Sequence, residues 1–174
     1  CEIGGGYGSF GEKLIKAFDC KYVSIDLPEA NFLASYYLKK NFLDKSIIGV
    51  TELNNGILNK DIFDQNQIFI LNPWNKINDI KFDLIINARS MMEMDTEIIN
   101  KYFDFIHRYI KKSGYFLNIN RYRKKSVGYP IHLYEYPYDN RWEVVVSKKS
   151  WRQSWVHFLL TKRIEKNFEK KTIQ

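Results

Sequence analysis

The first residues that could do chemistry are an acid and a run of glycines at the start of the chain. Glu2 precedes Gly4, Gly6 and Gly8 in the pattern E-h-G-x-G-x-G, and Gly5 lies in the same turn. Glycine adopts φ values that are closed to other residues, and the missing Cβ atom lets a ligand lie against the backbone. A carboxylate beside such a turn suits a ligand with an amine and a sulfonium, and it would sit poorly beside a pyrophosphate. The pattern therefore predicts a site for a cationic cofactor.

Asp26 is the second acid, and it follows an apolar run that ends at Ile25. A strand, a glycine turn, a helix, a second strand and an acid are typical of a nucleotide-type cofactor site at the carboxyl edge of a parallel sheet. Gly6 to Gly11 also satisfy the dinucleotide pattern G-x-G-x-x-G, with Asp26 near the usual distance for a ribose contact. NAD is therefore one candidate cofactor, and Glu2 favours S-adenosylmethionine (SAM) over it. A tight turn without a ligand is the third interpretation.

Apolar periodicity predicts the helices that position these residues. After the glycine turn, apolar residues recur at helical spacing, namely Phe10, Leu14, Ile15 and Phe18. A second helix is expected to start at Pro28, because proline suits a first helical turn. The expected buried face of this second helix consists of Phe32, Leu33, Tyr36 and Tyr37.

Further strands are expected at residues 67–71, 81–87 and 115–120. The first two are separated by about nine residues, too few for an ordinary crossover helix. We expect them to be joined by a turn or a poor helix, or not to be adjacent in the sheet. Asp95 can cap a helix that should run to Lys112 and stop at Gly114. Two late apolar runs, at 142–146 and 156–160, are expected to pair as antiparallel strands.

Length and composition indicate one domain. The chain of 174 residues and 20.8 kDa allows a sizeable core, and no apolar run approaches the length of a membrane span. The net charge of +7 permits an anionic partner without requiring one. Two cysteines do not suggest a disulfide framework, which favours a reducing cytoplasm. Because the chain starts on Cys1 inside an expected strand, we expect an N-terminal part to be missing, and we expect residues 164–174 to form a charged tail.

The glycine turn, Asp26 and the block from Asp83 to Met94 together resemble a class I SAM-dependent methyltransferase. More narrowly, the chain resembles the bacterial sugar O-methyltransferase family. The phrases IDLPE, SMMEM, GYFLNINRY, YPYD and SWRQ carry this match, which runs from near residue 1 to about residue 163. The resemblance implies an α/β, Rossmann-like domain over residues 1–163. Its sheet would be mixed and seven-stranded, with helices on both faces and a last strand inserted antiparallel.

The resemblance also implies roles for single residues. The aminoacyl part of SAM would be held by Glu2 and the glycine turn, that is by Gly4, Gly5, Gly6 and Gly8. Asp26 would accept hydrogen bonds from both ribose hydroxyls, with Leu27 packing nearby. The adenine would be bordered by Asn72, Pro73 and Trp74, and Asn87 would close the site beside the donor methyl group.

Asn72-Pro73-Trp74 is also similar to the Asn/Asp-Pro-Pro-aromatic loop with which amino-methyltransferases hold an amine. Here the second proline is missing. The motif also precedes the strand that ends at Asn87, whereas the amine-binding loop should end the strand beside the methyl group. We therefore do not interpret it as an amine-methylation motif.

A sugar hydroxyl is a poor nucleophile, so its methylation benefits from a general base or a metal ion. Glu93, which follows the strand ending at Asn87, and His132, in an irregular aromatic segment, are the two candidate bases. A charge near a helix start and a surface histidine are the structural alternatives. His107 and His157 are expected to be structural, and no cluster of residues has the spacing of a transition-metal site.

The candidate residues for binding the acceptor are Arg89, Arg121, Tyr122, Tyr134 and Tyr136. Tyrosines offer apolar area with a polar handle, so they could stack on sugar faces or equally cover a sheet edge. The favoured interpretation is a SAM-dependent O-methyltransferase that acts on a sugar hydroxyl of a small-molecule or glycan substrate. An NAD-dependent oxidoreductase and a basic nucleic-acid-binding module are the alternatives, with nucleic acid the less favoured partner.

Overall fold

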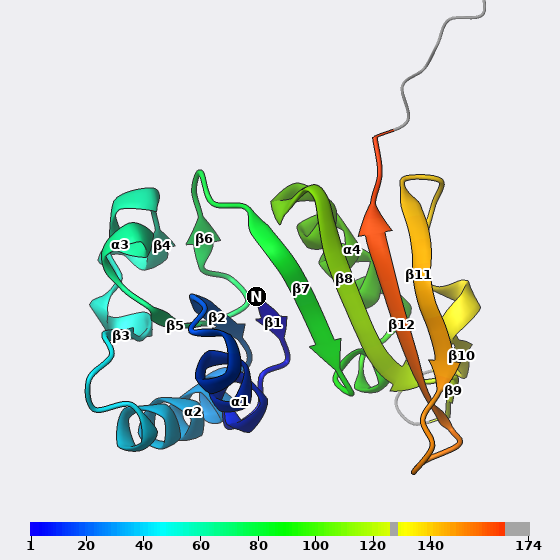
Figure 1. Ribbon diagram of the computed structural model, residues 1–174, viewed down its shortest axis with the longest axis horizontal. Helices are drawn as coiled ribbons and strands as arrows, with labels where there is room; N and C mark the ends of the chain where they lie inside the picture. Colours follow the sequence, from blue (N-terminus) through cyan, green and yellow to red (C-terminus); the bar gives the residue numbers. More distant parts are fainter. Residues whose placement is uncertain (126–128, 166–174) are drawn as a thin grey trace, which may run out of the picture.

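The computed structural model describes residues 1–125 and 129–165 and shows one large sheet flanked by helices (Figure 1). The strand order in this sheet is β11-β12-β8-β7-β1-β2-β5-β3. The parallel core consists of β1 (Glu2–Ile3), β2 (Tyr22–Ile25), β3 (Ile47–Ile48), β5 (Ile68–Leu71), β7 (Phe82–Ala88) and β8 (Ile110–Arg121). The predicted charged tail covers residues 164–174, and its residues 166–174 lie outside the described residues.

The late strands form the antiparallel end of the sheet. β12 (Val156–Arg163) lies between β8 and β11 (Trp142–Lys149) and is antiparallel to both. The predicted mixed sheet with an inserted antiparallel last strand is therefore confirmed. The sheet has eight strands instead of the expected seven, because the two-residue strand β3 pairs with β5 at the edge. Of the alternatives left open for the short connection between β5 and β7, the structure shows that the two strands are not neighbours in the sheet.

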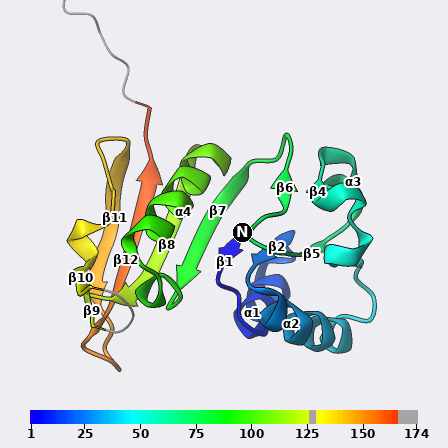
Figure 2. The same ribbon diagram turned by 180° about the vertical axis from the view of Figure 1, so that it is seen from behind.

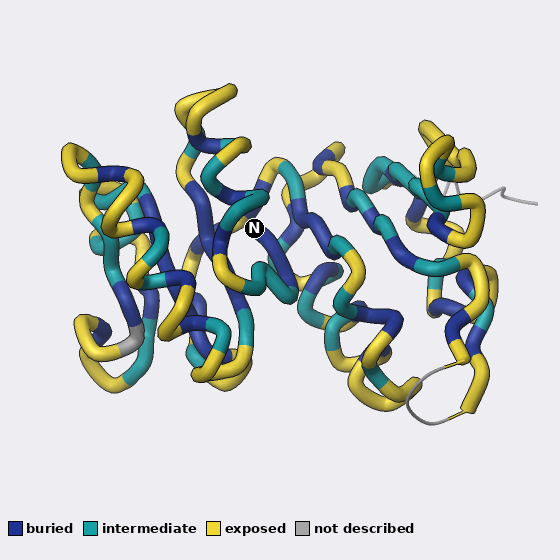
Figure 3. Tube along the Cα trace, turned by 90° about the horizontal axis from the view of Figure 1, so that it is seen from below, coloured by how far each residue is buried: buried dark blue, intermediate teal, exposed yellow. Residues whose placement is uncertain are grey.

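Two separate cores show that helices cover both faces of the sheet. Along β5, Ile68 and Ile70 pack in a core with α1 (Ser9–Phe18) and α2 (Pro28–Asn41). The alternate residues Phe69 and Leu71 pack in the larger core with α4 (Thr96–Tyr109), which runs beside β8 (Figure 2). Side chains alternate between the faces of a strand, so the two cores lie on opposite sides of the sheet. The central strands are buried between exposed turns (Figure 3).

Short elements connect these layers. They are η1 (Val50–Glu52), η2 (Asn54–Gly56), β4 (Ile57–Leu58), α3 (Lys60–Gln65), β6 (Lys76–Ile77), η3 (Met91–Glu93), β9 (Arg123–Lys124), β10 (Ile131–His132) and η4 (Leu133–Glu135). Two small pairs of strands lie outside the large sheet. β4 and β6 are parallel, and β9 and β10 are antiparallel. Between β8 and β11 the described chain therefore runs through short strands and a 3₁₀ turn.

Two helix predictions were wrong in detail. The expected buried face of α2 is exposed at Phe32, Leu33 and Tyr36. The helix instead buries Asn31, Ala34 and Leu38. These three positions lie on one helical face, and a buried Asn31 with several hydrogen bonds fixes which face meets the sheet. The helix capped by Asp95 ends at Tyr109, because the chain already pairs with β7 from Ile110 onward.

Candidate functional site

The glycine turn joins β1 to α1 at the carboxyl end of the parallel strands. Gly4, Gly6 and Gly8 have φ values of 76°, 55° and 93°, a region that favours glycine. A Cβ atom on Gly4 would meet Ser90 Oγ at 2.1 Å, so this glycine is required for packing. A Cβ atom on Gly6 would meet nothing within 4 Å. The backbone at Gly6 therefore faces open space that a ligand could use.

Asp26 is fixed beside this open backbone. Its Oδ2 accepts a 2.7 Å hydrogen bond from the Gly6 amide, and its Oδ1 accepts a 2.7 Å bond from the Leu27 amide. An ionised carboxylate has about four acceptor positions, so both oxygens keep capacity for further donors. The Leu27 side chain is exposed next to the carboxylate. This arrangement can accept a pair of hydroxyl groups and cover them with an apolar side chain.

Asn31 connects Asp26 to the loop after β5, and sequence reasoning missed it. Its Nδ2 donates to the backbone oxygen of Asp26 at 2.7 Å and to Asn72 Oδ1 at 2.8 Å. Asn72 is buried, whereas Pro73 and Trp74 are exposed. A hollow of about 310 Å³ borders Asn31 and Asn72. The only sequence signal for Asn31 is an amide near the start of a helix that follows the acid.

Glu2 lies under the glycine turn. Its side chain is 2% exposed, and its carboxylate accepts a hydrogen bond from the Tyr22 hydroxyl. Burial raises the pKa of Glu2, and the bond from Tyr22 opposes this rise. A Cβ atom on Gly11 would meet the Tyr22 ring at 2.3 Å, so the last glycine of G-x-G-x-x-G makes room for this tyrosine. Glu2 therefore supports the turn from below, which does not fit the expected direct contact with a ligand.

Asn87 is the centre of a buried amide network. Its Nδ2 donates to the Ile3 backbone oxygen at 2.9 Å and to Ser90 Oγ at 2.5 Å. Its Oδ1 accepts from the Met91 amide at 3.0 Å and from Asn120 Nδ2 at 2.7 Å. The side chain is fully buried, so it holds η3 against β1 and β8 and does not fit the expected place beside a bound methyl group. Sequence reasoning did not find its partners.

The two candidate bases lie on different segments. Glu93 is exposed on η3. Ser90, the residue that precedes η3, donates from its hydroxyl to the Ile3 backbone oxygen at 3.1 Å, immediately before the glycine turn. His132 ends β10; its Nδ1 lies 2.9 Å from Glu135 Oε2, and its ring stacks on Tyr134 with centroids 4.9 Å apart. The hydrogen bond of Ser90 thus anchors the start of η3 beside the glycine turn. His132 instead pairs with Arg123 of β9, and its ring lies 6.3 Å from that of Tyr122, centroid to centroid.

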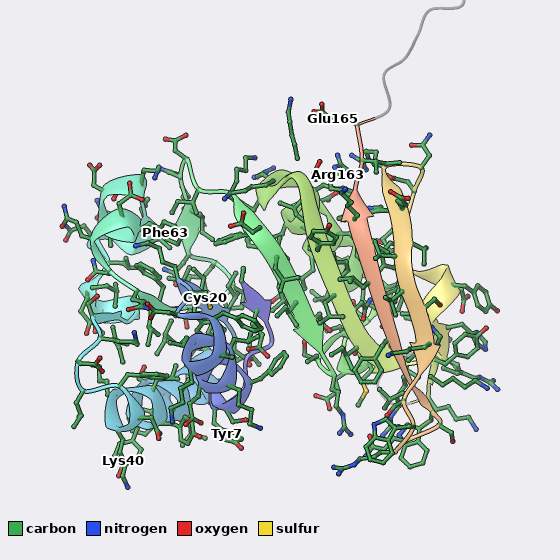
Figure 4. The ribbon with its side chains drawn as sticks, in the orientation of Figure 1. Tyr7, Cys20, Lys40, Phe63, Arg163 and Glu165 are labelled. Atoms are coloured by element: carbon green, nitrogen blue, oxygen red, sulfur yellow. The ribbon has the colours of Figure 1, made fainter. Side chains whose placement is uncertain are left out.

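The expected acceptor residues are only partly brought together. Arg89 follows β7 and Arg121 ends β8, so both lie at the carboxyl edge. The ring of Tyr122 lies 6.4 Å from the ring of Tyr134, centroid to centroid. Tyr136 packs in the core with its ring edge-on to Phe103, so its expected role in substrate binding does not fit the structure. In Figure 4 the label of Tyr7 marks the carboxyl edge of the parallel strands, and Arg163 is labelled at the opposite edge.

Larger hollows lie at the other end of the strands. They measure about 610 and 670 Å³, and both border Lys81 and Lys111, at the amino ends of β7 and β8. Neither is lined by Asp26 or by a glycine of the turn. Among residues 1–125 and 129–165, no group of three or more His, Cys, Asp and Glu residues could hold a metal ion. The same residues contain no helix that is long and apolar enough to cross a membrane.

No model of a protein family and no curated protein matches this chain. Solved structures do match it. The mitomycin 7-O-methyltransferase MmcR superposes with a TM-score of 0.64 at 15% identity, over 93% of this chain and 48% of its own. Magnesium protoporphyrin IX methyltransferase (ChlM) from Synechocystis PCC 6803, with bound SAM, gives 0.63 at 14% identity, over 94% and 68%. An O-methyltransferase family 2 protein from Planctomyces limnophilus, in complex with apigenin, gives 0.59 at 12% identity, over 94% and 49%.

These comparisons show the fold. The chain has the Rossmann-like methyltransferase fold, as its sheet order and antiparallel β12 also indicate. It spans about half the length of MmcR and of the Planctomyces limnophilus protein. The identities of these matches are too low to transfer a cofactor or a substrate to individual residues of this chain.

Proposed function

We propose that this chain is the cofactor-binding and catalytic region of a SAM-dependent O-methyltransferase whose acceptor is a sugar hydroxyl. One observation carries the proposal. The Asp26 carboxylate is held by the Gly6 and Leu27 amides next to backbone that is open for a ligand, at the carboxyl edge of a methyltransferase-type sheet. A preset acceptor for two hydroxyl groups beside a glycine turn fits the ribose and aminoacyl parts of SAM.

Some residues of the site would contact the cofactor, and others would support the turn that holds it. Asp26 would bind the ribose, and the open backbone at Gly6 would hold the aminoacyl part, next to Gly8, which packs against Leu38. Leu27 and the hollow beside Asn72 would hold the adenine, and the exposed Pro73 and Trp74 follow Asn72 in the chain. Gly4, Gly5, Glu2 and Asn87 would fix the shape of the turn from below.

SAM would supply an electrophilic methyl group on a sulfonium sulfur. The protein must then hold the acceptor oxygen in line behind that group, because positioning alone can supply much of the rate of a displacement reaction. Glu93 is the base that we favour, since η3 is bonded to the end of β1 beside the glycine turn. As the oxygen–methyl bond forms and the methyl–sulfur bond breaks, S-adenosylhomocysteine would leave and Glu93 would take the acceptor proton.

The structure offers less support for an NAD-dependent oxidoreductase. Sheets of the dinucleotide-binding type are mostly parallel with the order 3-2-1-4-5-6. Here β12 is inserted antiparallel between β8 and β11.

The sugar acceptor rests on the resemblance described above and on the exposed tyrosines Tyr122 and Tyr134, whose rings can stack on a sugar face. The test is methyl transfer from tritium-labelled SAM, catalysed by the full-length protein. One acceptor panel would hold nucleotide-linked and free sugars, and the other would hold phenols. We expect labelled methyl ethers from the sugar panel. Label in the phenol panel alone would contradict the sugar acceptor and leave O-methylation intact, whereas label in neither panel would contradict both.

A further inference from the structure

A fourth hollow lies away from the glycine turn, between the β11–β12 hairpin and the segment that follows β8. It has a volume of about 330 Å³. We call it the ring pocket and define it by six of its lining residues, Tyr122, Tyr134, Trp142, Val144, Ser147 and His157. It is on the α4 side of the sheet, because Trp142 and Tyr138, which also lines it, pack in the same core as α4.

Two buried polar atoms in the lining of the ring pocket have no hydrogen-bond partner in the structure. They are Trp142 Nε1 and His157 Nδ1. Buried polar groups in proteins nearly always have a partner, so an unpaired one calls for an explanation such as a bound molecule. The other ring nitrogen, His157 Nε2, lies 2.8 Å from Ser147 Oγ. Two residues that line one cavity therefore each carry an unpaired polar atom, which points to a ligand with hydrogen-bonding groups.

Burial, followed by the charge of Lys149, lowers the pKa of His157. The imidazole is therefore neutral near neutral pH and offers one donor and one acceptor, while Trp142 offers only a donor. The described lining contains one acid, Asp139, and this carboxylate is already paired with Arg141. These groups suit neutral hydroxyls better than a charged ligand.

The remaining walls of the ring pocket are aromatic and aliphatic. Tyr122 lies 6.4 Å from Tyr134 and 6.0 Å from His157, measured between ring centroids. Leu133, Val144 and Leu159 complete the apolar part of the lining. Aromatic walls pack against the faces of a ring, and a few placed polar groups fix its orientation, as is usual in small-molecule sites. The volume is that of a small ligand pocket.

We propose that the ring pocket binds a six-membered ring that carries hydroxyl groups, with the ring between the aromatic walls and its hydroxyls bonded to Trp142 and His157. This assignment replaces the expectation that His157 is merely structural. A pyranose and a phenol share this chemistry, and the experiment distinguishes them.

The ring pocket also has a place in the proposed methyl transfer, a point that rests on the proposed function. His157 pairs in register with Asn120 of β8, whose amide is bonded to Asn87 of β7. Neighbouring strands lie about 4.8 Å apart, so His157 is roughly 10 Å across the sheet from β7. We infer that the pocket holds a ring of the acceptor remote from the hydroxyl that is methylated.

The experiment uses saturation-transfer NMR with two probes, methyl β-D-glucopyranoside and catechol, and needs neither SAM nor turnover. Val144 is 61% exposed and lines the pocket, so Val144→Trp should fill the pocket without disturbing the core. Val146 is its matched control: it pairs with Leu160, whereas Val144 pairs with Thr161, so the two valines face opposite sides of the sheet. Both variants would first be shown to be folded by their thermal unfolding.

We expect the parent and Val146→Trp to transfer saturation to the ring protons of at least one probe. Val144→Trp should weaken that binding by about tenfold or more, equal to about 1.4 kcal/mol. A response to the glucopyranoside alone identifies a sugar subsite, and a response to catechol alone identifies a phenol subsite. No response to either probe, or equal binding by Val144→Trp, would overturn the proposal. Titration with S-adenosylhomocysteine separates the two claims, because loss of cofactor binding bears on the proposed function alone.

Discussion

The backbone amide of Gly6 donates a 2.7 Å hydrogen bond to Oδ2 of Asp26, which joins the turn after β1 to the end of β2. The two strands are parallel neighbours, with Ile3 opposite Ile25, so their carboxyl ends meet at one edge of the sheet. The bond fixes the carboxylate before any ligand arrives. A preorganised acceptor of this kind reduces the entropic cost of binding.

The first prediction is that Asp26→Ala loses most of the affinity for S-adenosylhomocysteine. A buried hydroxyl pair would lose a charged acceptor, which costs about 1.5–3 kcal/mol or roughly a 10- to 150-fold loss. Calorimetric titration measures this loss. Asp44→Ala removes another acid from an exposed loop and should bind like the parent. Unchanged affinity in folded Asp26→Ala would remove Asp26 from the site.

The second prediction compares two glycines. Gly6→Ala should abolish cofactor binding and cost about 1 kcal/mol of stability, because the new Cβ meets no protein atom within 4 Å but the residue keeps a φ of 55°. Gly11→Ala should instead destabilise the fold by about 1–3 kcal/mol, since its Cβ would meet the Tyr22 ring at 2.3 Å. Chemical denaturation and calorimetry of both variants give the comparison. If folded Gly6→Ala binds S-adenosylhomocysteine as tightly as the parent, the turn does not contact the ligand.

The third prediction concerns pH. The folded-state pKa of Glu2 is raised above its ordinary value of 4.5, so its contribution to stability is present below that value and falls as pH rises through the raised pKa. Tyr22→Phe removes the donor that stabilises the charged form. The variant should therefore lose more stability near pH 7 than near pH 4, by about 1–3 kcal/mol.

Urea unfolding across this pH range measures the effect of Tyr22→Phe. Tyr36→Phe changes an exposed tyrosine of α2 and serves as the control, with no expected pH-dependent difference from the parent. If Tyr22→Phe loses the same stability at both pH values, the charge of Glu2 does not depend on Tyr22.

The fourth prediction separates the two candidate bases in the full-length enzyme. Glu93→Gln should keep its affinity for S-adenosylhomocysteine and lose about 10²–10⁴-fold in turnover, the usual effect of losing a general base. His132→Asn should stay within a few-fold of the parent, because His132 is paired with Glu135 and stacked on Tyr134. The pH–rate profile of Glu93→Gln should also change. Turnover lost by His132→Asn instead would assign the base to His132.

Local sequence patterns were enough to predict the path of the chain at the site. The glycine spacing, the strand that ends at Asp26 and the antiparallel pairing of the two late strands all appear in the structure. Each depends on residues close together in sequence, or on a periodicity that a window of residues carries. The strand ends then bring the glycine turn and Asp26 together without further information.

Long-range polar pairs could not be predicted in the same way. Tyr22 reaches Glu2 across 20 residues, and Asn120 reaches Asn87 across 33 residues. Neither pair follows a periodic pattern, so the sequence gives no sign that these side chains are used inside the protein. The buried face of α2 was mispredicted for the same reason. The long-range hydrogen bonds of Asn31 turn its side of the helix toward the sheet, although another side is more apolar.

The most direct test of a SAM site is a calorimetric titration of this chain with S-adenosylhomocysteine, followed by a titration of a fresh sample with NAD. The Asp26 carboxylate beside the open backbone at Gly6 predicts one saturable site for S-adenosylhomocysteine. The antiparallel β12, which is not typical of a dinucleotide-binding sheet, predicts no heat of binding for NAD. Saturable binding of NAD to the folded chain, with no binding of S-adenosylhomocysteine, would contradict the proposed methyltransferase site.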